Sequence, residues 1–406
     1  MARQNGYPAR LLSDALDSLE WSCEEVTMVL NDMQAEIVKA VRAYAQEKIR
    51  PRSKAFEAAG HFPSELFLEL GGLGLMGFTA PESAGGAGAD CVSYAASLME
   101  IAAADGALST ILSIQNSIIV PGLLRYGTAS QVEQFLPPLT RGESVGAFAL
   151  TEAHAGSDAA AIHTRATRSL GGWRINGRKQ FITSGQIAGL TFLIAVTDPK
   201  AGKKGLTCFL VPRGRPGFHV ERRESKLGQK ASDTCALRLE DLFLENELVL
   251  GEVGSGYPIA LANLEAGRIG IAAQSVGMAQ AALDVAIAYA RGRHSMGRPI
   301  IEHQAVGFRL AELATKNEAA RQLVLHAASK KDAGQNCVVE ASMCKLFASS
   351  VAEEVVSGAL QTLGGYGYLE DYEIAKIYRD VRVCQIYEGT SDIQRLVISR
   401  ALASGE

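Results

Sequence analysis

The chain has 406 residues, of which 47% are hydrophobic and 21% charged, and a formal net charge of −4. This balance is typical of a globular protein of two or three domains, and the lack of a basic run leaves no electrostatic signal for nucleic-acid binding. No apolar stretch approaches the length of a membrane span, so neither nucleic acid nor a membrane is an expected partner.

The N-terminus and the cysteines bear on the location of the protein. The first residues lack the apolar core of a signal peptide, and Asp14, Asp17 and Glu20 argue against an acid-poor transit peptide. The seven cysteines are scattered, without a Cys-x-x-Cys pair, and are expected to be small core residues in a reducing compartment. We expect a bacterial-like cytoplasmic location in preference to the mitochondrial matrix.

The first third of the chain is predicted to be helical after an N-terminal extension at 1–25. Apolar residues at helical spacing predict a helix from Met28 to Ile49 that Pro51 ends, and more helices follow up to residue 145. Gly72-Leu-Gly-Leu-Met-Gly77 matches the glycine pattern of dinucleotide-binding loops. No strand precedes it, so we interpret it as a helix end followed by a turn.

The next hundred residues favour β structure. Strands are predicted at 172–177, 181–183, 191–196 and 206–211, separated by Asn-Gly, Asp-Pro and Pro-Gly turn signals. Short strands with turns between them indicate a small barrel or sandwich at 146–250.

Helical periodicity returns in the last third, in segments at 258–291, 302–331, 338–363 and 392–402. Four long helices with short connections predict a four-helix bundle at 251–406. The expected fold is therefore a multidomain α+β fold, with an N-terminal all-α domain at 26–145, a middle β domain and a C-terminal helical bundle.

The first candidate for chemistry is Glu388, which lies between Tyr387 and Gly389 just before a helix. Thr390 or Ser391 can cap that helix. A carboxylate at a loop-to-helix junction can point into a cavity, and the glycine permits close approach to the backbone. By itself the residue also fits an ordinary solvated or capping role.

Five other segments have residue types that suit ligand binding: 148–158, 179–185, 265–268, 291–304 and 361–368. The first has backbone N–H groups and hydroxyls for a polar ligand edge, and the second has Phe181 and Thr183 on one strand face. Glu265 and Arg268 share a helix face, and the last two offer arginines for a pyrophosphate and paired glycines. Each also has a structural explanation: a Gly/Ser turn, a core strand, an intrahelical ion pair, a basic helix end and a C-cap.

Taken together, these motifs resemble the acyl-CoA dehydrogenase family across roughly residues 26–402. The motifs are Thr151-Glu-Ala-His-Ala-Gly-Ser-Asp158, Phe181-Ile-Thr183, Gly267-Arg-Ile-Gly-Ile-Ala-Ala-Gln274, Arg293-His-Ser-Met-Gly-Arg-Pro-Ile300, Leu363-Gly-Gly-Tyr-Gly-Tyr368 and Tyr387-Glu-Gly-Thr-Ser-Asp-Ile-Gln394. Their order and spacing match the family, and the helix with Gly267 looks most like the short-chain, butyryl-CoA branch. The resemblance implies an FAD enzyme, a homotetramer, that acts on an acyl-CoA and passes electrons to an electron-transfer flavoprotein.

The resemblance also implies roles for individual residues. FAD contacts are implied for Phe148, Ala149, Leu150, Thr151, Gly156, Ser157, Phe181, Ile182, Thr183, Arg293, Ser295, His303, Gln304, Gln361, Gly364, Gly365, Thr390 and Asp392. Substrate contacts are implied for Ser157, Glu265, Arg268 and Gly389, and no metal is implied. Glu388 would be the base that takes the α-proton, and the β-hydrogen would leave as hydride to flavin N5.

Several positions depart from the family pattern. Ala153 and His154 stand where Pro and Gly are usual, and Ser295 and Met296 replace a common Gln-Phe pair. Ser109 stands where the glutaryl-CoA branch has an arginine, which argues against a dicarboxylate substrate. Three alternatives stay open: an acyl-CoA oxidase, a dehydrogenase of acyl groups on a carrier protein, and a non-enzymatic CoA- or FAD-binding assembly protein.

Overall fold

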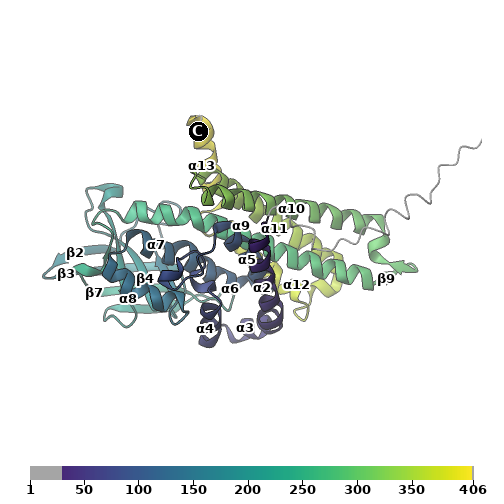
Figure 1. The fold of residues 1–406 in the computed structure, drawn as a ribbon, viewed down its shortest axis with the longest axis horizontal. Coiled ribbons are helices and arrows are strands. Elements are labelled where there is room, and N and C mark those ends of the chain that lie inside the picture. Colours follow the sequence, from purple (N-terminus) through teal and green to yellow (C-terminus); the bar gives the residue numbers. More distant parts are fainter. Residues whose placement is uncertain (1–29, 405–406) are drawn as a thin grey trace, which may run out of the picture.

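The structure is a computed structural model that describes residues 30–404 (Figure 1). The predicted N-terminal extension, the predicted helix start at Met28 and Cys23 lie outside these residues. Within them a layer of helices, a β-sheet and a second group of helices follow one another along the chain, which confirms the expected fold class. The domain limits after residues 25, 145 and 250 stay a proposal.

The N-terminal part is all helical. Its helices are α2 (Asp32–Tyr44), α3 (Ser53–Ala59), α4 (Ser64–Gly72), α5 (Cys91–Ala104), α6 (Gly106–Ile114), α7 (Val120–Tyr126) and α8 (Ala129–Thr140). The helix predicted to stop before Pro51 ends at Ile49. A 3-10 turn that contains Pro51 then leads directly into α3, because a proline in the first turn of a helical segment needs no N–H partner. The segment after Gly72 is a turn with Gly74 at φ 74°, as interpreted from sequence.

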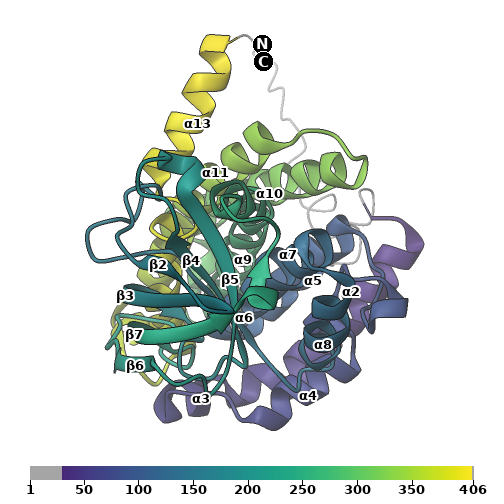
Figure 2. The same ribbon diagram turned by 90° about the vertical axis from the view of Figure 1, so that its left-hand side faces the viewer.

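The middle part is one mixed sheet. Its strands are β1 (Gly146–Ala149), β2 (Arg165–Ser169), β3 (Gly172–Thr183), β4 (Leu190–Val196), β5 (Leu206–Pro212), β6 (Phe218–Arg223), β7 (Thr234–Glu245) and β8 (Val249–Leu250). The strand order is β6-β7-β3-β2-β4-β5-β8, and β1 pairs in parallel with β4. Helices cover one side of this sheet (Figure 2).

The prediction of a turn at Asn176-Gly177 is wrong, because β3 runs through it. The pairing of β3 with β7 shifts register between Ile175 and Gly177, so the dipeptide forms a bulge. Asn176 stays in the sheet because its side-chain oxygen accepts from the N–H of Asp241 at 2.8 Å and its Nδ2 donates to the Asp241 carboxylate at 3.0 Å. A long partner strand therefore overrides the local turn signal.

The C-terminal part is built around one long helix. Its elements are α9 (Gly256–Gly292), the hairpin β9 (His294–Ser295) and β10 (Arg298–Pro299), α10 (Gln304–Asp332), α11 (Val338–Leu363), α12 (Glu373–Val381) and α13 (Ser391–Ser404). Helix α9 packs against α5, α10 and α11, and α13 leaves this group at an angle (Figures 1 and 2). The four predicted helices are present, whereas the short α12 was not predicted.

Helix α9 is largely apolar, and most of it is buried among other elements. At Gly277 a Cβ would lie 2.1 Å from the Met99 carbonyl oxygen, so glycine lets α5 and α9 touch through their backbones. The expectation that no apolar stretch approaches a membrane span is corrected here: α9 and the stretch Gly106–Tyr126 are both long and apolar enough. Most of each is buried in the protein, and core packing explains their composition. The six described cysteines are likewise buried and free.

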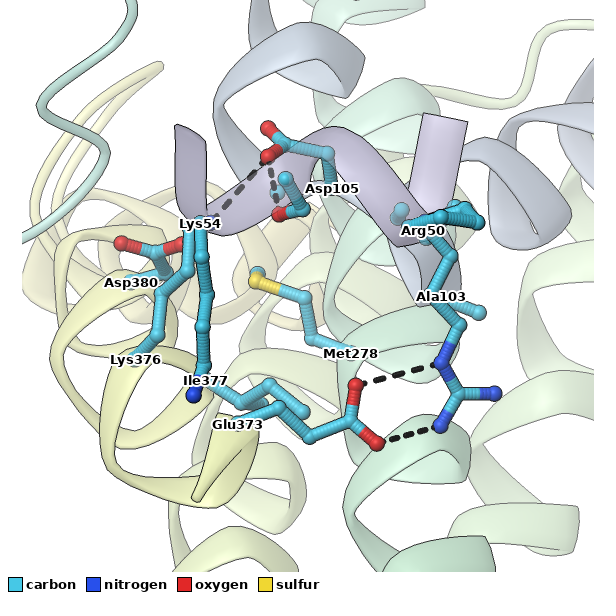
Figure 3. Close-up of a pocket in the computed structure, with 14 residues that line it drawn as sticks. Arg50, Lys54, Ala103, Asp105, Met278, Glu373, Lys376, Ile377 and Asp380 are labelled. Atoms are coloured by element: carbon cyan, nitrogen blue, oxygen red, sulfur yellow. Dashed lines mark hydrogen bonds and ion pairs between the residues drawn. The ribbon is translucent and has the colours of Figure 1, made fainter. Parts of the chain in front are cut away.

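A buried ionic cluster joins the N-terminal helices to α12. Lys376 Nζ lies 3.2 Å from Asp105 Oδ2 and 2.6 Å from Asp380 Oδ2, and Ser53 Oγ donates to Asp105. These side chains border a cavity of about 130 Å³, at whose edge Arg50 forms a double hydrogen bond with Glu373 (Figure 3). The cluster fixes α12, and with it the loop that follows, against the helices before the sheet.

A second buried ion pair anchors the loop after β1. Lys179 Nζ on β3 lies 2.8 Å from Glu152 Oε1 and donates to the Leu150 carbonyl oxygen at 2.8 Å. The N–H groups of His163 and Thr164 donate to the same carboxylate. Burial opposes the charge on Glu152, but Lys179 and these hydrogen bonds lower its pKa to about 2.

Breaking this pair is predicted to destabilise the protein. Lys179→Met leaves Glu152 buried without its counter-charge, which typically costs about 3–5 kcal/mol, so the midpoint of thermal unfolding should fall clearly at pH 7. Because the pKa of Glu152 is lowered in the folded state, its stabilisation is present above its unfolded pKa, about 4.3, and is lost as the pH falls toward 2. The difference in unfolding midpoint between Lys179→Met and the wild type should therefore become smaller below pH 4.

The matched control is Lys39→Met, since Lys39 forms an exposed pair with Glu36 and such pairs contribute little. Equal unfolding midpoints for Lys179→Met and the wild type at pH 7 would contradict the prediction.

Candidate active site

Glu388 lies in the loop between α12 and α13, with its carboxylate against α9. Its backbone is left-handed, at φ 53°, and its Oε2 is buried without a hydrogen-bond partner. A Cβ at Gly267 would stand 2.7 Å from that oxygen, 3.3 Å from Glu388 Cδ and 3.8 Å from Ser117 Oγ. The carboxylate therefore occupies the space that the missing side chain of Gly267 leaves on α9.

The residue before Glu388 is held by side chains from three elements. The Tyr387 hydroxyl donates to Gln274 Oε1 on α9, lies 3.2 Å from Thr110 Oγ1 on α6, and accepts from Gln229 Nε2 at 3.4 Å. Gln229 belongs to the loop between β6 and β7, and its N–H donates to Asp380 of the buried cluster. The position of Tyr387 thus depends on contacts from the sheet and from both groups of helices.

The residue after Glu388 is held through its carbonyl oxygen. Gly389 O accepts from Lys345 Nζ on α11 and from Gln394 Nε2 on α13, both at 2.8 Å. Gly389 itself has φ 86°, and a Cβ there would lie 2.7 Å from Gln394 Nε2. A left-handed non-glycine residue is costly, and the contacts on both sides explain how Glu388 keeps this conformation.

The electrostatic surroundings suit proton transfer near neutral pH. Burial raises the pKa of Glu388 to about 7, against the opposing charges of Lys345 and Arg268. A base works best when its pKa lies near the working pH. The structure therefore offers a partly buried glutamate whose Oε2 is buried without a hydrogen-bond partner and is able to accept a proton.

Glu265 and Arg268 do not form the intrahelical pair considered from sequence. Glu265 Oε1 accepts from Cys337 Sγ at 3.3 Å and lies 3.7 Å from Lys331 Nζ. Arg268 donates instead to Ser342 Oγ at 3.1 Å, and its Nε has no partner. Both side chains lie near the N-terminal part of α11, on the same helix as Gly267.

The candidate residues of the sheet lie where the loop after β1 meets the end of β3. The N–H of Gln180 donates to the Thr151 carbonyl oxygen at 2.8 Å, which joins the two segments. Phe181 is 63% exposed and Thr183 partly exposed, whereas Ile182 between them is buried. Phe181 and Thr183 therefore share the open face, as expected.

This face carries features that suit a planar ligand. Phe181 and Ser184 have left-handed backbones, and the pairing of β3 with β7 shifts between Lys179 and Ile182. Nothing in the described chain covers most of the Phe181 ring, and Ser184 Oγ is buried without a partner. Of the preceding loop, Ala149 and Leu150 are buried, Phe148 and Thr151 are partly exposed, and Gly156 and Ser157 are exposed.

The remaining candidates gather at the far end of α9 and α11. They are Arg293, Ser295, His303, Gln304, Gln361, Gly364 and Gly365. The rings of Tyr289 and Tyr366, 6.1 Å apart, join the two helix ends, and His303 Nε2 contacts the Ser295 carbonyl oxygen at 3.0 Å. The 26 residues from Gly267 to Arg293 span roughly 39 Å at 1.5 Å per residue. Within one chain, these residues therefore lie far from Glu388.

The last two candidates belong to α13. Thr390 is the N-cap, because its Oγ1 accepts from the N–H of Ile393 at 3.4 Å. Asp392 is exposed and accepts from Arg395 at 2.9 Å. Within residues 30–404, no group of three His, Cys, Asp or Glu side chains could hold a metal ion.

Sequence reasoning missed the residues that hold the Glu388 loop. They are Thr110, Gln229, Gln274, Lys345 and Gln394. Signals existed for three of them: Gln274 and Gln394 end two of the motifs given above, and Lys345 is a lone charge on a face of α11 made of Ala, Ser and Cys. Thr110 and Gln229 are polar residues whose partners lie far away in sequence.

Glu388 thus lies where the sheet meets two groups of helices, and the comparison with known protein families identifies the class of enzyme. Family models for the N-terminal, middle and C-terminal domains of acyl-CoA dehydrogenase match residues 31–143, 147–242 and 254–403. The chain belongs to the acyl-CoA dehydrogenase family.

Individual relatives show which members of the family the chain is similar to. An acyl-CoA dehydrogenase of Bacillus subtilis is 44% identical over 93% of this chain and 100% of its own. The butyryl-CoA dehydrogenase structure from Megasphaera elsdenii has a TM-score of 0.90 at 39% identity, covering 92% of this chain and 99% of that one. The chain is thus similar to the short-chain, butyryl-CoA-type members.

Two further solved structures bear on partners. A structure reported under the electron transferring flavoprotein of Acidaminococcus fermentans has a TM-score of 0.90 at 39% identity, covering 92% of this chain and 98% of that one. A glutaryl-CoA dehydrogenase from Mycobacterium smegmatis, described in complex with FADH2, has a TM-score of 0.89 at 30% identity, covering 94% and 97%.

Adding a side chain at Gly267 is predicted to displace the Glu388 carboxylate. A Cβ there would lie 2.7 Å from Oε2 and 3.3 Å from Cδ, so Gly267→Ala should lower the rate of acyl-CoA dehydrogenation by roughly tenfold or more while the protein stays folded. The matched control is Gly292→Ala at the end of the same helix, where a Cβ would meet nothing within 4 Å. Wild-type rates in Gly267→Ala would show that the contact does not constrain Glu388.

Proposed function

We propose that the protein dehydrogenates a short-chain acyl-CoA between Cα and Cβ, with Glu388 as the base that takes the α-proton. FAD is its cofactor, and an electron-transfer flavoprotein receives the electrons. One observation carries the proposal: Glu388 is a buried carboxylate with a pKa of about 7, no partner on Oε2, and a backbone held on both sides. The product would be the trans-2-enoyl-CoA.

The residues on the open face of the sheet fit a flavin. An exposed phenylalanine ring, a neighbouring hydroxyl and the joined loop at Thr151 can flank a flat ring system and bond its polar edge. We assign Phe148 to Thr151, Gly156, Ser157 and Phe181 to Thr183 to this half of FAD, together with Thr390 and Asp392. Bound FAD supplies the acceptor for the β-hydrogen, which leaves as hydride.

The nucleotide half of FAD requires a second chain in this proposal. This group combines a basic hairpin with an open glycine turn, where a Cβ at Gly364 or Gly365 would meet nothing within 4 Å. Its residues are Arg293, Ser295, His303, Gln304, Gln361, Gly364 and Gly365. They lie roughly 39 Å from Glu388 along α9, beyond the reach of one dinucleotide. We therefore infer that these residues serve the FAD of a neighbouring subunit in a homotetramer.

The chain's own residues would carry the proton chemistry. Glu388 accepts the α-proton, and its backbone N–H donates to the thioester oxygen, where negative charge develops. Ser157, Glu265, Arg268 and Gly389 hold the acyl-CoA beside it. Ser109, at the position of the glutaryl-branch arginine, is buried and donates to the Gly106 carbonyl oxygen at 2.8 Å, so it offers no cation for a second carboxylate.

The alternatives from the sequence lead to distinct observations. An acyl-CoA oxidase would reoxidise its flavin with O2 rather than with an electron-transfer flavoprotein. A dehydrogenase of carrier-bound acyl groups would be reduced by acyl-carrier protein and not by acyl-CoA. A non-enzymatic assembly protein would bind butyryl-CoA without bleaching the flavin.

The base assignment is tested with Glu388→Gln, which keeps the volume and polarity of the side chain but cannot take a proton at neutral pH. FAD and acyl-CoA should still bind, because other residues hold them. Flavin reduction by butyryl-CoA, followed anaerobically by stopped flow, should fall by at least 10²–10⁴-fold, the range typical of lost general-base catalysis. Reoxidation by the electron acceptor should be unchanged.

Glu265→Gln is the matched control, since it removes the other carboxylate near the site but leaves Glu388 intact. If Glu388→Gln reduced its flavin at the wild-type rate while Glu265→Gln was inactive, the base would be misassigned. Glu265 on α9 would then be the candidate base.

The proposed assembly predicts that activity requires an oligomer. Light scattering should give a tetramer with about one FAD per chain, because each nucleotide half would need the hairpin of a neighbour. Arg293→Ala should lower FAD retention and leave the secondary structure intact, as measured by flavin absorbance after gel filtration. A fully active monomer would contradict the proposal.

A further inference from the structure

Lys345 on α11 is a buried cation without a carboxylate partner. Its exposed fraction is 0%, and its ammonium donates to the Gly389 carbonyl oxygen at 2.8 Å. Among residues 30–404, no Asp or Glu oxygen lies within ion-pair distance of it. Burying an unpaired charge is costly, so this lysine requires an explanation beyond packing.

The other two buried lysines of the described chain show the usual solution. Lys179 lies 2.8 Å from Glu152, and Lys376 lies 2.6 Å from Asp380 and 3.2 Å from Asp105. Lys345 instead contacts the backbone of the residue that follows Glu388. The titratable groups that favour its charged form are Cys384, a buried thiol, and Glu388, whose carboxylate is one residue away from the hydrogen bond of Lys345.

We propose that Lys345 is a positioning residue for the base: it holds the Gly389 carbonyl oxygen, which fixes the left-handed backbone of Glu388, and its charge favours the ionised carboxylate. This inference rests on the proposed function, in which Glu388 takes the α-proton. It gives Lys345 a part in the reaction that is separate from the FAD contact proposed for Gln361 on the same helix.

The charged groups around Glu388 come from three helices. Lys345 on α11 and Arg268 on α9 favour its ionised form, and Lys345 has the larger effect. Tyr94 on α5 also faces it. Arg268 is engaged with Ser342 and interacts with Glu265, whereas Lys345 has no such competing carboxylate. Loss of Lys345 should therefore shift Glu388 toward its neutral form.

The test is the pH dependence of kcat/KM for butyryl-CoA in Lys345→Met and Lys345→Arg holoenzymes. The acidic limb of this profile reports the base in the free enzyme. In Lys345→Met the limb should move up by about one pH unit, with roughly tenfold lower kcat/KM below it and recovery at higher pH. Lys345→Arg keeps the charge and should return the limb to its wild-type position.

Two controls separate position and charge from folding. Lys179→Met also unpairs a buried group but lies in the sheet, so its acidic limb should stay in place while its stability falls. If Lys345→Met does not yield folded holoenzyme, Lys345→Gln, which keeps an amide donor without the charge, should show the same upward shift. A wild-type acidic limb in a folded, FAD-loaded Lys345→Met or Lys345→Gln enzyme would overturn the proposal.

A negative result for Lys345 can be distinguished from a failure of the assignment of Glu388 as the base. If Glu388→Gln reduces its flavin at the wild-type rate, the proposed function fails whatever the Lys345 variants do. If Glu388→Gln is inactive and the Lys345 variants keep the wild-type acidic limb of the kcat/KM profile, only the proposed role of Lys345 fails.

Discussion

The structure depends on the burial of one carboxylate against a helix that has no side chain at the point of contact. Gly267 leaves the space that Glu388 Oε2 occupies, and the surrounding helices exclude water from it. Burial raises the pKa of the carboxyl, while Lys345 and Arg268 counteract burial. The result is an acid whose two protonation states are close in free energy near pH 7. The pKa of a solvent-exposed carboxylate is not raised in this way, because water stabilises its charged form.

Holding that carboxylate requires contributions from every part of the chain. The loop between β6 and β7 brings Gln229 to Tyr387, and the cluster of Asp105, Lys376 and Asp380 holds both α12 and Gln229. Gly228 permits this docking, since a Cβ there would lie 2.2 Å from the Arg379 carbonyl oxygen. The three parts of the fold are therefore coupled at the site, and its geometry is a property of their packing.

The separation of the candidate residues into two groups has a physical consequence. Helix α9 carries Gly267 near one end and leads to Arg293 at the other, so its rigid rise keeps the two groups apart. In the proposed function, the contacts of one FAD to both groups come from two chains, and the length of α9 then links cofactor binding to assembly.

The sequence by itself determined the order of helical and β segments, the long C-terminal helices and the position of Glu388 before a capped helix, because these depend on local periodicity and capping. It misread Asn176-Gly177 as a turn, where pairing with β7 outweighs the local preference of the dipeptide. Only the tertiary structure decided that Arg268 pairs with Ser342 rather than Glu265, and that Lys345 lies beside Gly389. Those contacts join residues far apart in the chain, and no spacing pattern encodes them.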